Sequence, residues 1–161
     1  MKPRGHPRFG AKKRERPEHD EQQRIKRLLD LAAIDYYDTS QPFQAFITPG
    51  LPDLRCFAWV PLEALMAFGN GASGAATYEG GRHWSYMTFE IETKAPGVGR
   101  QSPEQATYER RCEVSGHPYV LGGLLEVKAF LEAVGLAKRT VGGQWALWAV
   151  GVRVNRHNRI T

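Results

Sequence analysis

The hydrophobic residues in the first half of the chain recur at spacings that predict one helix followed by strands. Over residues 18–35 the apolar positions are three or four residues apart, which is the period of an amphipathic helix. Two apolar segments joined by a Pro-Gly turn then predict short strands over 43–48 and 53–60. Residues 61–68 fit a short helix, and the small and glycine-rich residues of 69–81 predict a flexible loop.

The clearest strand of the chain is predicted over residues 83–94. Its apolar side chains alternate with Glu90, Glu92 and Lys94, which therefore project from the same face of the strand. Such alternation is typical of a strand with an apolar face on the core and a polar face in solvent. We therefore expect the three charged residues to be accessible.

The second half of the chain interleaves helices with strands. Ser102 as N-cap, Pro103 after it and Gln105 at the reciprocal capping position predict the start of a helix that ends near Ser115. The elements that follow are a strand over 117–121, a helix over 124–134 and a strand over 144–155. This order predicts an α/β fold with a mixed sheet flanked by helices.

The charge of the chain is concentrated at its beginning. The 161 residues suit one domain and have a net charge of +5. Residues 1–17 hold seven Lys or Arg and one Glu, a charge of +6, so that the rest sums to −1. We expect a flexible basic arm over 1–17 and a single domain over 18–161. The arm, with Lys12, Lys13 and Arg14, either binds nucleic-acid phosphates or only aids solubility.

Other features limit the class of protein. No segment approaches the roughly 20 apolar residues of a membrane helix, and no secretory signal is present, so we expect a cytoplasmic protein without a membrane partner. Cys56 and Cys112 lack zinc-ligand spacing and are expected to be small buried residues. His83 and His117 have no partner at ligand spacing, and we expect structural or solvent roles for both.

One pattern of charged residues predicts chemistry. Glu92 could hold a hard divalent cation, while Lys94 beside it could orient a water molecule and stabilise charge on a phosphate. Asp53 begins a strand after a Pro-Gly-Leu-Pro turn and could supply a second carboxylate, whereas Glu63 and Glu79 follow no such turn. A site of this kind suits Mg²⁺ or Mn²⁺ and phosphodiester hydrolysis. The same residues also fit a solvated Glu–Lys pair, so both interpretations stay open from the residues alone.

Three motifs in a fixed order then point to a family. They are GLPDL at 50–54, FEIETK at 89–94 and SPEQ at 102–105. With these motifs the chain resembles the virus-type replication-repair nuclease family of the PD-(D/E)xK restriction-endonuclease-like superfamily over about residues 18–135. The resemblance implies a restriction-endonuclease-like α/β core. Residues 61–82 exceed the family pattern and are predicted to be an insertion, and 140–161, a C-terminal strand and basic tail, lie outside it.

The resemblance also implies roles for individual residues. By position, Asp53 and Glu92 would be metal ligands and Lys94 the catalytic lysine. The backbone carbonyl of Thr93 would be a further metal ligand. Gln105 matches a Gln near the active site of the family, and it fits helix capping equally well.

Two more positions have alternatives. The family has a Glu on its first helix, which would be a further metal ligand. Glu18 is the first candidate for it and Glu21 the competitor, and the alternative is an acidic first turn that complements the helix dipole. Arg100, in the loop after Lys94, would contact a phosphate or be an exposed loop charge.

The function implied by the resemblance is that of a Mg²⁺- or Mn²⁺-dependent DNA endonuclease, a hydrolase. Similarity to Holliday-junction resolvases implies branched DNA as substrate, a homodimer, and a role in replication, repair or recombination. A bacterial or phage-encoded protein would fit. Two alternatives are a non-catalytic nucleic-acid-binding module that uses the basic arm, and a structural or assembly protein of a phage or mobile element.

Overall fold

The computed structural model describes residues 17–40, 49–68, 72–79, 82–97 and 99–147. In chain order its elements are α1 (Pro17–Leu31), β1 (Asp35–Asp38), β2 (Leu54–Pro61), α2 (Leu62–Phe68), β3 (Ala72–Glu79), β4 (Arg82–Thr93), α3 (Pro103–Ser115), β5 (Tyr119–Gly122), α4 (Leu124–Ala133), β6 (Ala137–Arg139) and β7 (Trp145–Leu147). None of these helices is long and apolar enough to cross a membrane.

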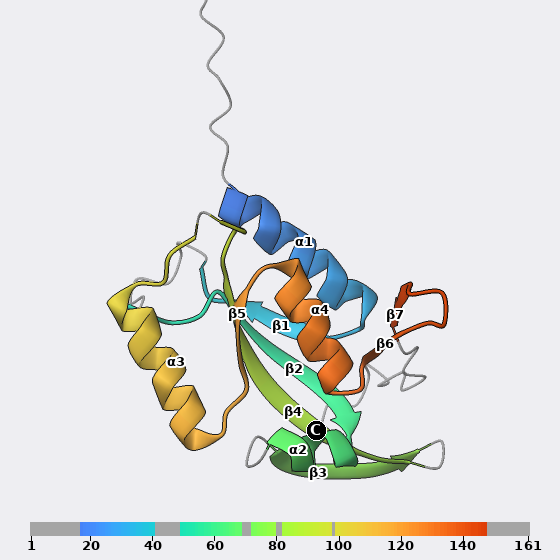
Figure 1. The fold of residues 1–161 in the computed structure, drawn as a ribbon. Coiled ribbons are helices and arrows are strands. Elements are labelled where there is room, and N and C mark those ends of the chain that lie inside the picture. Colours follow the sequence, from blue (N-terminus) through green and yellow to red (C-terminus); the bar gives the residue numbers. More distant parts are fainter. Residues whose placement is uncertain (1–16, 41–48, 69–71, 80–81, 98, 148–161) are drawn as a thin grey trace, which may run out of the picture.

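A mixed sheet organises the fold. Its five strands have the order β1-β2-β4-β3, and β5 pairs with β4 as well. The beginning of β4 pairs antiparallel with β3, and its end pairs parallel with β5. Because β2 occupies the other side of β4, β3 and β5 share one of its edges (Figure 1). The predicted α/β fold with a mixed sheet between helices is therefore confirmed.

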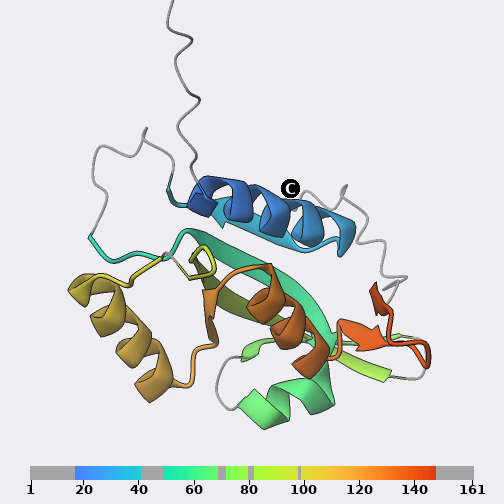
Figure 2. The same cartoon turned by 45° about the horizontal axis from the view of Figure 1, so that its top comes forward.

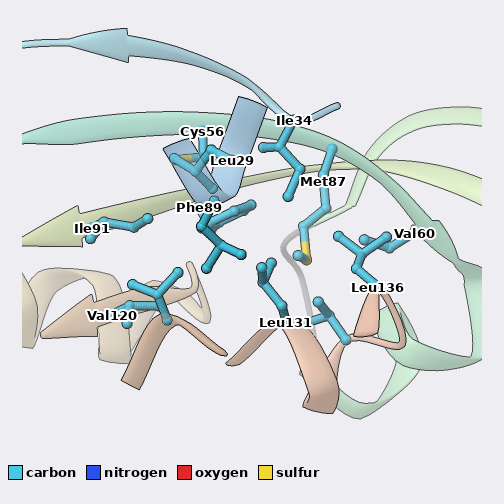
Figure 3. Close-up of a cluster of buried hydrophobic side chains, with 14 of the residues drawn as sticks. Leu29, Ile34, Cys56, Val60, Met87, Phe89, Ile91, Val120, Leu131 and Leu136 are labelled. Atoms are coloured by element: carbon cyan, nitrogen blue, oxygen red, sulfur yellow. The ribbon is translucent and has the colours of Figure 1, made fainter. Parts of the chain in front are cut away.

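One face of the sheet forms the hydrophobic core. Alternate residues of β2 and β4 meet apolar residues of α1 and α4, which lie beside each other in Figures 1 and 2. The buried side chains on this face include Leu54, Cys56, Ala58, Val60, Met87, Phe89 and Ile91. Figure 3 shows Phe89 among Leu29, Val120 and Leu131. Each of the Val, Leu, Ile, Phe and Met side chains in this set contributes about 1.5–3 kcal/mol by leaving water, so this face fixes the register of β2 against β4.

The opposite face of β4 differs from the sequence prediction. Glu90 and Glu92 were expected in solvent, but each is 1% exposed. The reason is that α3 lies against this face and contacts both carboxylates, Glu92 through Gln105 and Glu90 through Tyr108. The central strand is thus buried on both sides near its end.

Two element predictions in the first half of the chain were wrong. Residues 72–79, part of the predicted loop, form β3, because backbone hydrogen bonds to the free edge of β4 outweigh the weak strand preference of small residues. The first helix ends at Leu31, not at residue 35, and the chain turns at Ala33, where φ is +54°. Asp35–Asp38 then forms β1, which was not predicted. The strand predicted over 43–48 lies outside the described residues.

The segment predicted to be an insertion, 61–82, contains α2 and β3. Leu65 of α2 is buried in the core, so this helix is integrated into the domain. At the C-terminal end, Trp145–Leu147 is a strand within the predicted 144–155, and it pairs with β6, which was not predicted. The remainder of that prediction, and the basic tail, lie outside the described residues. Cys56 and Cys112 are buried free thiols, as expected.

Candidate functional site

The pairing of β2 with β4 brings the predicted acidic residues together. Leu54 lies opposite Ile91 in the register, so Asp53, one residue before β2, lies beside Glu92 near the end of β4. The Asp53 carboxylate accepts a hydrogen bond of 2.8 Å from the backbone N–H of Thr93. Thr93, which was predicted to offer its carbonyl, therefore has its backbone at the site and fixes the orientation of Asp53.

Glu92 is the most enclosed member of the site. Its Oε1 atom accepts hydrogen bonds from Lys94 Nζ, at 2.8 Å, and from Gln105 Nε2. Its Oε2 atom is buried and has no hydrogen-bond partner among the described residues. Burial of a carboxylate oxygen without a partner is costly, so Glu92 is suited to an additional electropositive ligand at that oxygen.

Glu18, in the first turn of α1, adds a third carboxylate. Its Oε1 atom is 3.9 Å from Lys94 Nζ, and its side chain is about half-exposed. Gly99 packs closely here, since a Cβ atom on it would lie 2.8 Å from Glu18 Oε1 and 2.9 Å from Lys94 Cδ. We call Glu18, Asp53, Glu92 and Lys94 the acidic site.

The electrostatics of the acidic site are set by three carboxylates and one ammonium group. Burial, together with the negative charges of Asp53 and Glu18, raises the pKa of Glu92 to about 7, although the hydrogen bond and the positive charge of Lys94 oppose the rise. Burial also raises the pKa of Asp53, although the hydrogen bond from Thr93 opposes this. With all groups ionised the site has a formal charge of −2, which a divalent cation would neutralise.

Gln105 caps α3, as one of the two interpretations predicted, and it also contacts Glu92. Its backbone N–H donates to Ser102 Oγ at 3.2 Å, and its Oε1 accepts from the Ser102 N–H at 2.9 Å, which is a capping box. Its Nε2 donates to Glu92 at the same time. The cap of α3 thus aims an amide at the acidic site.

The turn before Asp53 packs against the start of α3. Gly50 has a φ of +87°, and a Cβ atom on it would lie 2.7 Å from the carbonyl carbon and oxygen of Glu104. Only glycine suits both the left-handed backbone and this close approach. Two of the three sequence motifs are therefore in direct contact.

Glu21, the competitor of Glu18, lies elsewhere. It is buried, and its Oε1 accepts a hydrogen bond of 2.7 Å from the backbone N–H of Leu124, at the start of α4. The Arg24 guanidinium lies 3.3 Å from its other oxygen. Glu21 therefore joins α1 to the N-terminus of α4, and only Glu18 of the two contacts Lys94.

Of the residues predicted to bind nucleic acid, the structure describes Arg100. Arg100 is exposed, and it follows Gly99 in the loop beside the acidic site. Lys12, Lys13 and Arg14 lie outside the described residues. Arg100 is therefore accessible to a ligand, and the prediction for the basic arm stays a prediction.

The donors present can be compared with the needs of a metal ion. Within the described ranges no three Asp, Glu, His or Cys side chains are grouped closely enough to hold a metal by themselves. Mg²⁺ needs fewer, because it keeps several water molecules and is usually bound through one or two carboxylates and substrate phosphates. Asp53, Glu92 through its unpaired Oε2, and the Thr93 carbonyl are oxygen donors of this kind.

A second charged cluster on β4 was missed by the sequence interpretation. Glu90 Oε1 lies 2.8 Å from Arg55 Nε, 3.3 Å from the Tyr108 hydroxyl and 3.5 Å from His117 Nε2. His117 therefore has an acidic neighbour, which the sequence spacing did not indicate. Glu90 precedes Glu92 by two residues, and Arg55 follows Asp53 by two. Because residues two apart on a strand share a face, this spacing could have predicted that Glu90 and Arg55 lie on the face of the acidic site.

Comparison with models of known protein families, with curated proteins and with solved structures gives no match. The geometry of the acidic site is therefore the basis of the functional argument.

Proposed function

We propose that the protein is a metal-dependent DNA endonuclease that hydrolyses phosphodiester bonds at the acidic site, with a restriction-endonuclease-like PD-(D/E)xK core. The observation that supports this most directly is the position of Glu92, a buried carboxylate beside two others and in contact with one lysine. A buried excess of negative charge next to an ammonium group is an arrangement suited to a cation and an anionic substrate.

The residues of the site have separable roles in this proposal. Asp53 and Glu92 would hold Mg²⁺ or Mn²⁺, which when bound supplies a Lewis acid and an activated water molecule. Lys94 orients the attacking water and stabilises charge on the phosphate. Gln105 holds Glu92 Oε1 in place through its amide. Glu18, on the accessible side of Lys94, accepts a hydrogen bond from water.

The substrate and assembly are part of the same proposal. By resemblance to Holliday-junction resolvases, the substrate is branched DNA, and two copies of the chain cut its two strands as a homodimer. Light scattering coupled to size-exclusion chromatography, with and without a four-way junction, measures the oligomeric state directly. A monomer in both conditions would remove the dimer from the proposal while leaving the chemistry in place.

Cleavage is tested with a labelled four-way junction, a duplex and a single strand, each in Mg²⁺, in Mn²⁺ and in EDTA. We expect cutting only with metal, and we expect Glu92→Gln to reduce it at least about 100-fold. Glu113→Gln, which removes an exposed carboxylate from α3, is the matched control and should cut at the original rate. Absence of cutting with DNA binding intact would reject the enzyme in favour of a binding module.

A further inference from the structure

The sheet face that holds the acidic site continues past α3. The side chains of β2 on this face are Arg55, Phe57 and Trp59, and those of β4 are Glu90, Thr88 and Tyr86, which follow from the pairing of the two strands. Tyr37 of β1 lies opposite Arg55 in the register. Along β2 and β4, away from the acidic site, the surface is charged at Arg55 and Glu90 and then aromatic at Phe57 and Tyr86, whereas Tyr37 lies beside Arg55 on β1.

A pocket of about 580 Å³ opens where α3 meets this face. Among the residues that line it are two arginines, one carboxylate and one imidazole, which belong to Arg55, Arg111, Glu90 and His117. With neutral His117, the two arginines exceed the one carboxylate by a charge of +1. Arg55 gives its Nε to Glu90 yet remains about half-exposed, and Arg111 is exposed. Guanidinium N–H groups in this setting are suited to a phosphate.

The aromatic part adjoins this pocket through Phe57. The Phe57 ring centre is 5.6 Å from that of Tyr37 and 6.2 Å from that of Tyr86. These three rings also line a second hollow of about 440 Å³, together with Asp35 and Tyr36. Tyr37 is 69% exposed, although its ring is large and apolar. Phe57 and Tyr86 are partly buried beside it. An exposed ring that continues into further rings, beside arginines, is typical of surfaces that bind single-stranded nucleic acid.

The arginine-lined pocket and the aromatic hollow differ in charge, and the difference matches a strand of nucleic acid. The arginines lie nearer the acidic site, where a strand backbone must pass to be cut. Asp35 lies at the aromatic end, where it repels phosphates but accepts hydrogen bonds from the amino groups of bases. Arg55 is two residues along β2 from Asp53, about 7 Å at the usual rise of a strand.

We propose that this surface binds a single-stranded segment of nucleic acid, with a backbone phosphate at Arg111 and bases stacked on Tyr37 and Phe57. The inference rests on the proposed nuclease function, for which it names the part of the substrate held beside the cleaved bond. A branched or frayed DNA provides such a segment, whereas an intact duplex does not expose the faces of its bases.

The test measures binding without cleavage. Fluorescence anisotropy of a labelled oligothymidylate is recorded in EDTA for the full chain and for variants at exposed positions. Tyr37→Ala should weaken binding about tenfold, and Tyr37→Phe, which keeps the ring, should bind as the original protein does. Arg111→Gln should lower the slope of log affinity against log salt by about 0.7, the value for one phosphate contact on a single strand.

Arg110→Gln is the matched control for charge. Arg110 is the neighbour of Arg111 on α3 and is also exposed, but it does not line the pocket. The Arg110→Gln variant should therefore show the same salt slope as the original protein. Equal effects of the two arginine variants, or equal binding by Tyr37→Ala and Tyr37→Phe, would overturn the proposal. Tight binding of a labelled duplex with none of the single strand would overturn it too.

The outcome is distinguishable from that of the proposed function. Because EDTA prevents metal-dependent cutting, a protein that cleaves nothing can still lose affinity through Tyr37→Ala, and the surface would then stand without the nuclease. Conversely, metal-dependent cutting that needs Glu92, with unchanged affinities of the Tyr37 and Arg111 variants, would leave the nuclease and remove the surface. Self-association that depends on Tyr37 would identify a second copy of the chain as the occupant instead.

Discussion

Glu90 and Glu92 are two carboxylates on one face of one strand, and their surroundings are opposite. Both are 1% exposed, and each has one oxygen, Oε2, that is buried without a hydrogen-bond partner among the described residues. Glu90 has a guanidinium, a phenol and an imidazole around its other oxygen. Glu92 has one ammonium and one amide, and two further carboxylates are close enough to raise its pKa.

The two carboxylates therefore differ in how far the chain itself compensates their charge. Arg55 compensates the charge of Glu90, and the cluster joins β2, β4 and α3. The charge of Glu92 is not compensated by the chain alone, because one lysine is shared among Asp53, Glu92 and Glu18. The proposed role of Glu92 therefore rests on burial among like charges, and not on burial alone.

The largest effect that separates the two acids should be the pH dependence of stability in EDTA. The pKa of Glu92 is about 7 in the folded protein, against the usual 4.5. Between these values the folded state keeps a proton that the unfolded state has lost, so stability falls as the pH rises through this window. Between pH 4.5 and 8 the original protein should lose on the order of 3 kcal/mol more than Glu92→Gln.

Urea unfolding followed by circular dichroism at several pH values measures this difference. Glu113→Gln, at an exposed acid of α3, should keep the pH dependence of the original protein. Parallel curves for the original protein and Glu92→Gln would show that Glu92 ionises in the folded state as easily as in the unfolded one, and the contrast with Glu90 would lose its physical basis.

Glu90→Gln should affect stability and spare the chemistry. It removes the charge that pairs with Arg55, and loss of hydrogen bonds to a charged group costs about 1–3 kcal/mol; the lower part of that range applies because Arg55 is half-exposed. Unfolding in urea at pH 8 measures the loss. Under conditions in which the Glu90→Gln variant is folded, its rate of metal-dependent cleavage should differ less than tenfold from that of the original protein. A variant as stable as the original would contradict the joining role of Glu90.

The parts of the molecule that were predictable from sequence depend on local signals. The start of α3 follows from Ser102, Pro103 and Gln105, whose capping pattern is complete within four residues. The end of β4 follows from strict alternation. The grouping of Asp53 with Glu92 and Lys94 was expected from the motif order, and the register of β2 with β4 brings them together.

The parts that were missed depend on contacts between distant segments. β1 and β3 have little strand signal of their own and exist as pairs with β2 and β4. The burial of Glu90 and Glu92 requires α3 to lie against the strand, and an alternating pattern cannot reveal such a cover. The separation of Glu18 from Glu21 likewise required the position of α4, since both fit the inward face of the same helix.

The packing of the turn before Asp53 offers a smaller effect. Gly50→Ala combines a left-handed backbone with a Cβ contact of 2.7 Å to the backbone of Glu104. Gly97→Ala is the matched control, because Gly97 also has a positive φ, +73°, but no contact within 4 Å of its Cβ position is found among the described residues. Both should lose about 1 kcal/mol from backbone strain, and Gly50→Ala should lose at least about 1 kcal/mol more.

Thermal unfolding of the two variants in parallel checks this difference. Gly50→Ala should also weaken metal-dependent cleavage, since Asp53 follows that turn and Gln105 begins the helix it contacts. Equal melting temperatures for the two variants would mean that the turn can move away from α3 without cost.

The smallest effect repeats the contrast of the two β4 acids on α1. Glu21 accepts the backbone N–H of Leu124 at the positive end of α4, whereas Glu18 is half-exposed beside Lys94. Glu21→Gln weakens a helix cap and a charge–dipole interaction and should lower the free energy of unfolding by about 1 kcal/mol, with cleavage retained. Glu18→Gln should leave stability within about 0.5 kcal/mol and reduce cleavage several-fold at limiting Mn²⁺.

Urea unfolding and a metal titration of cleavage are measured for both variants. If the effects were exchanged, the capping acid would belong to the site and Glu18 to the fold, and compensation by neighbours would no longer distinguish the two kinds of acid.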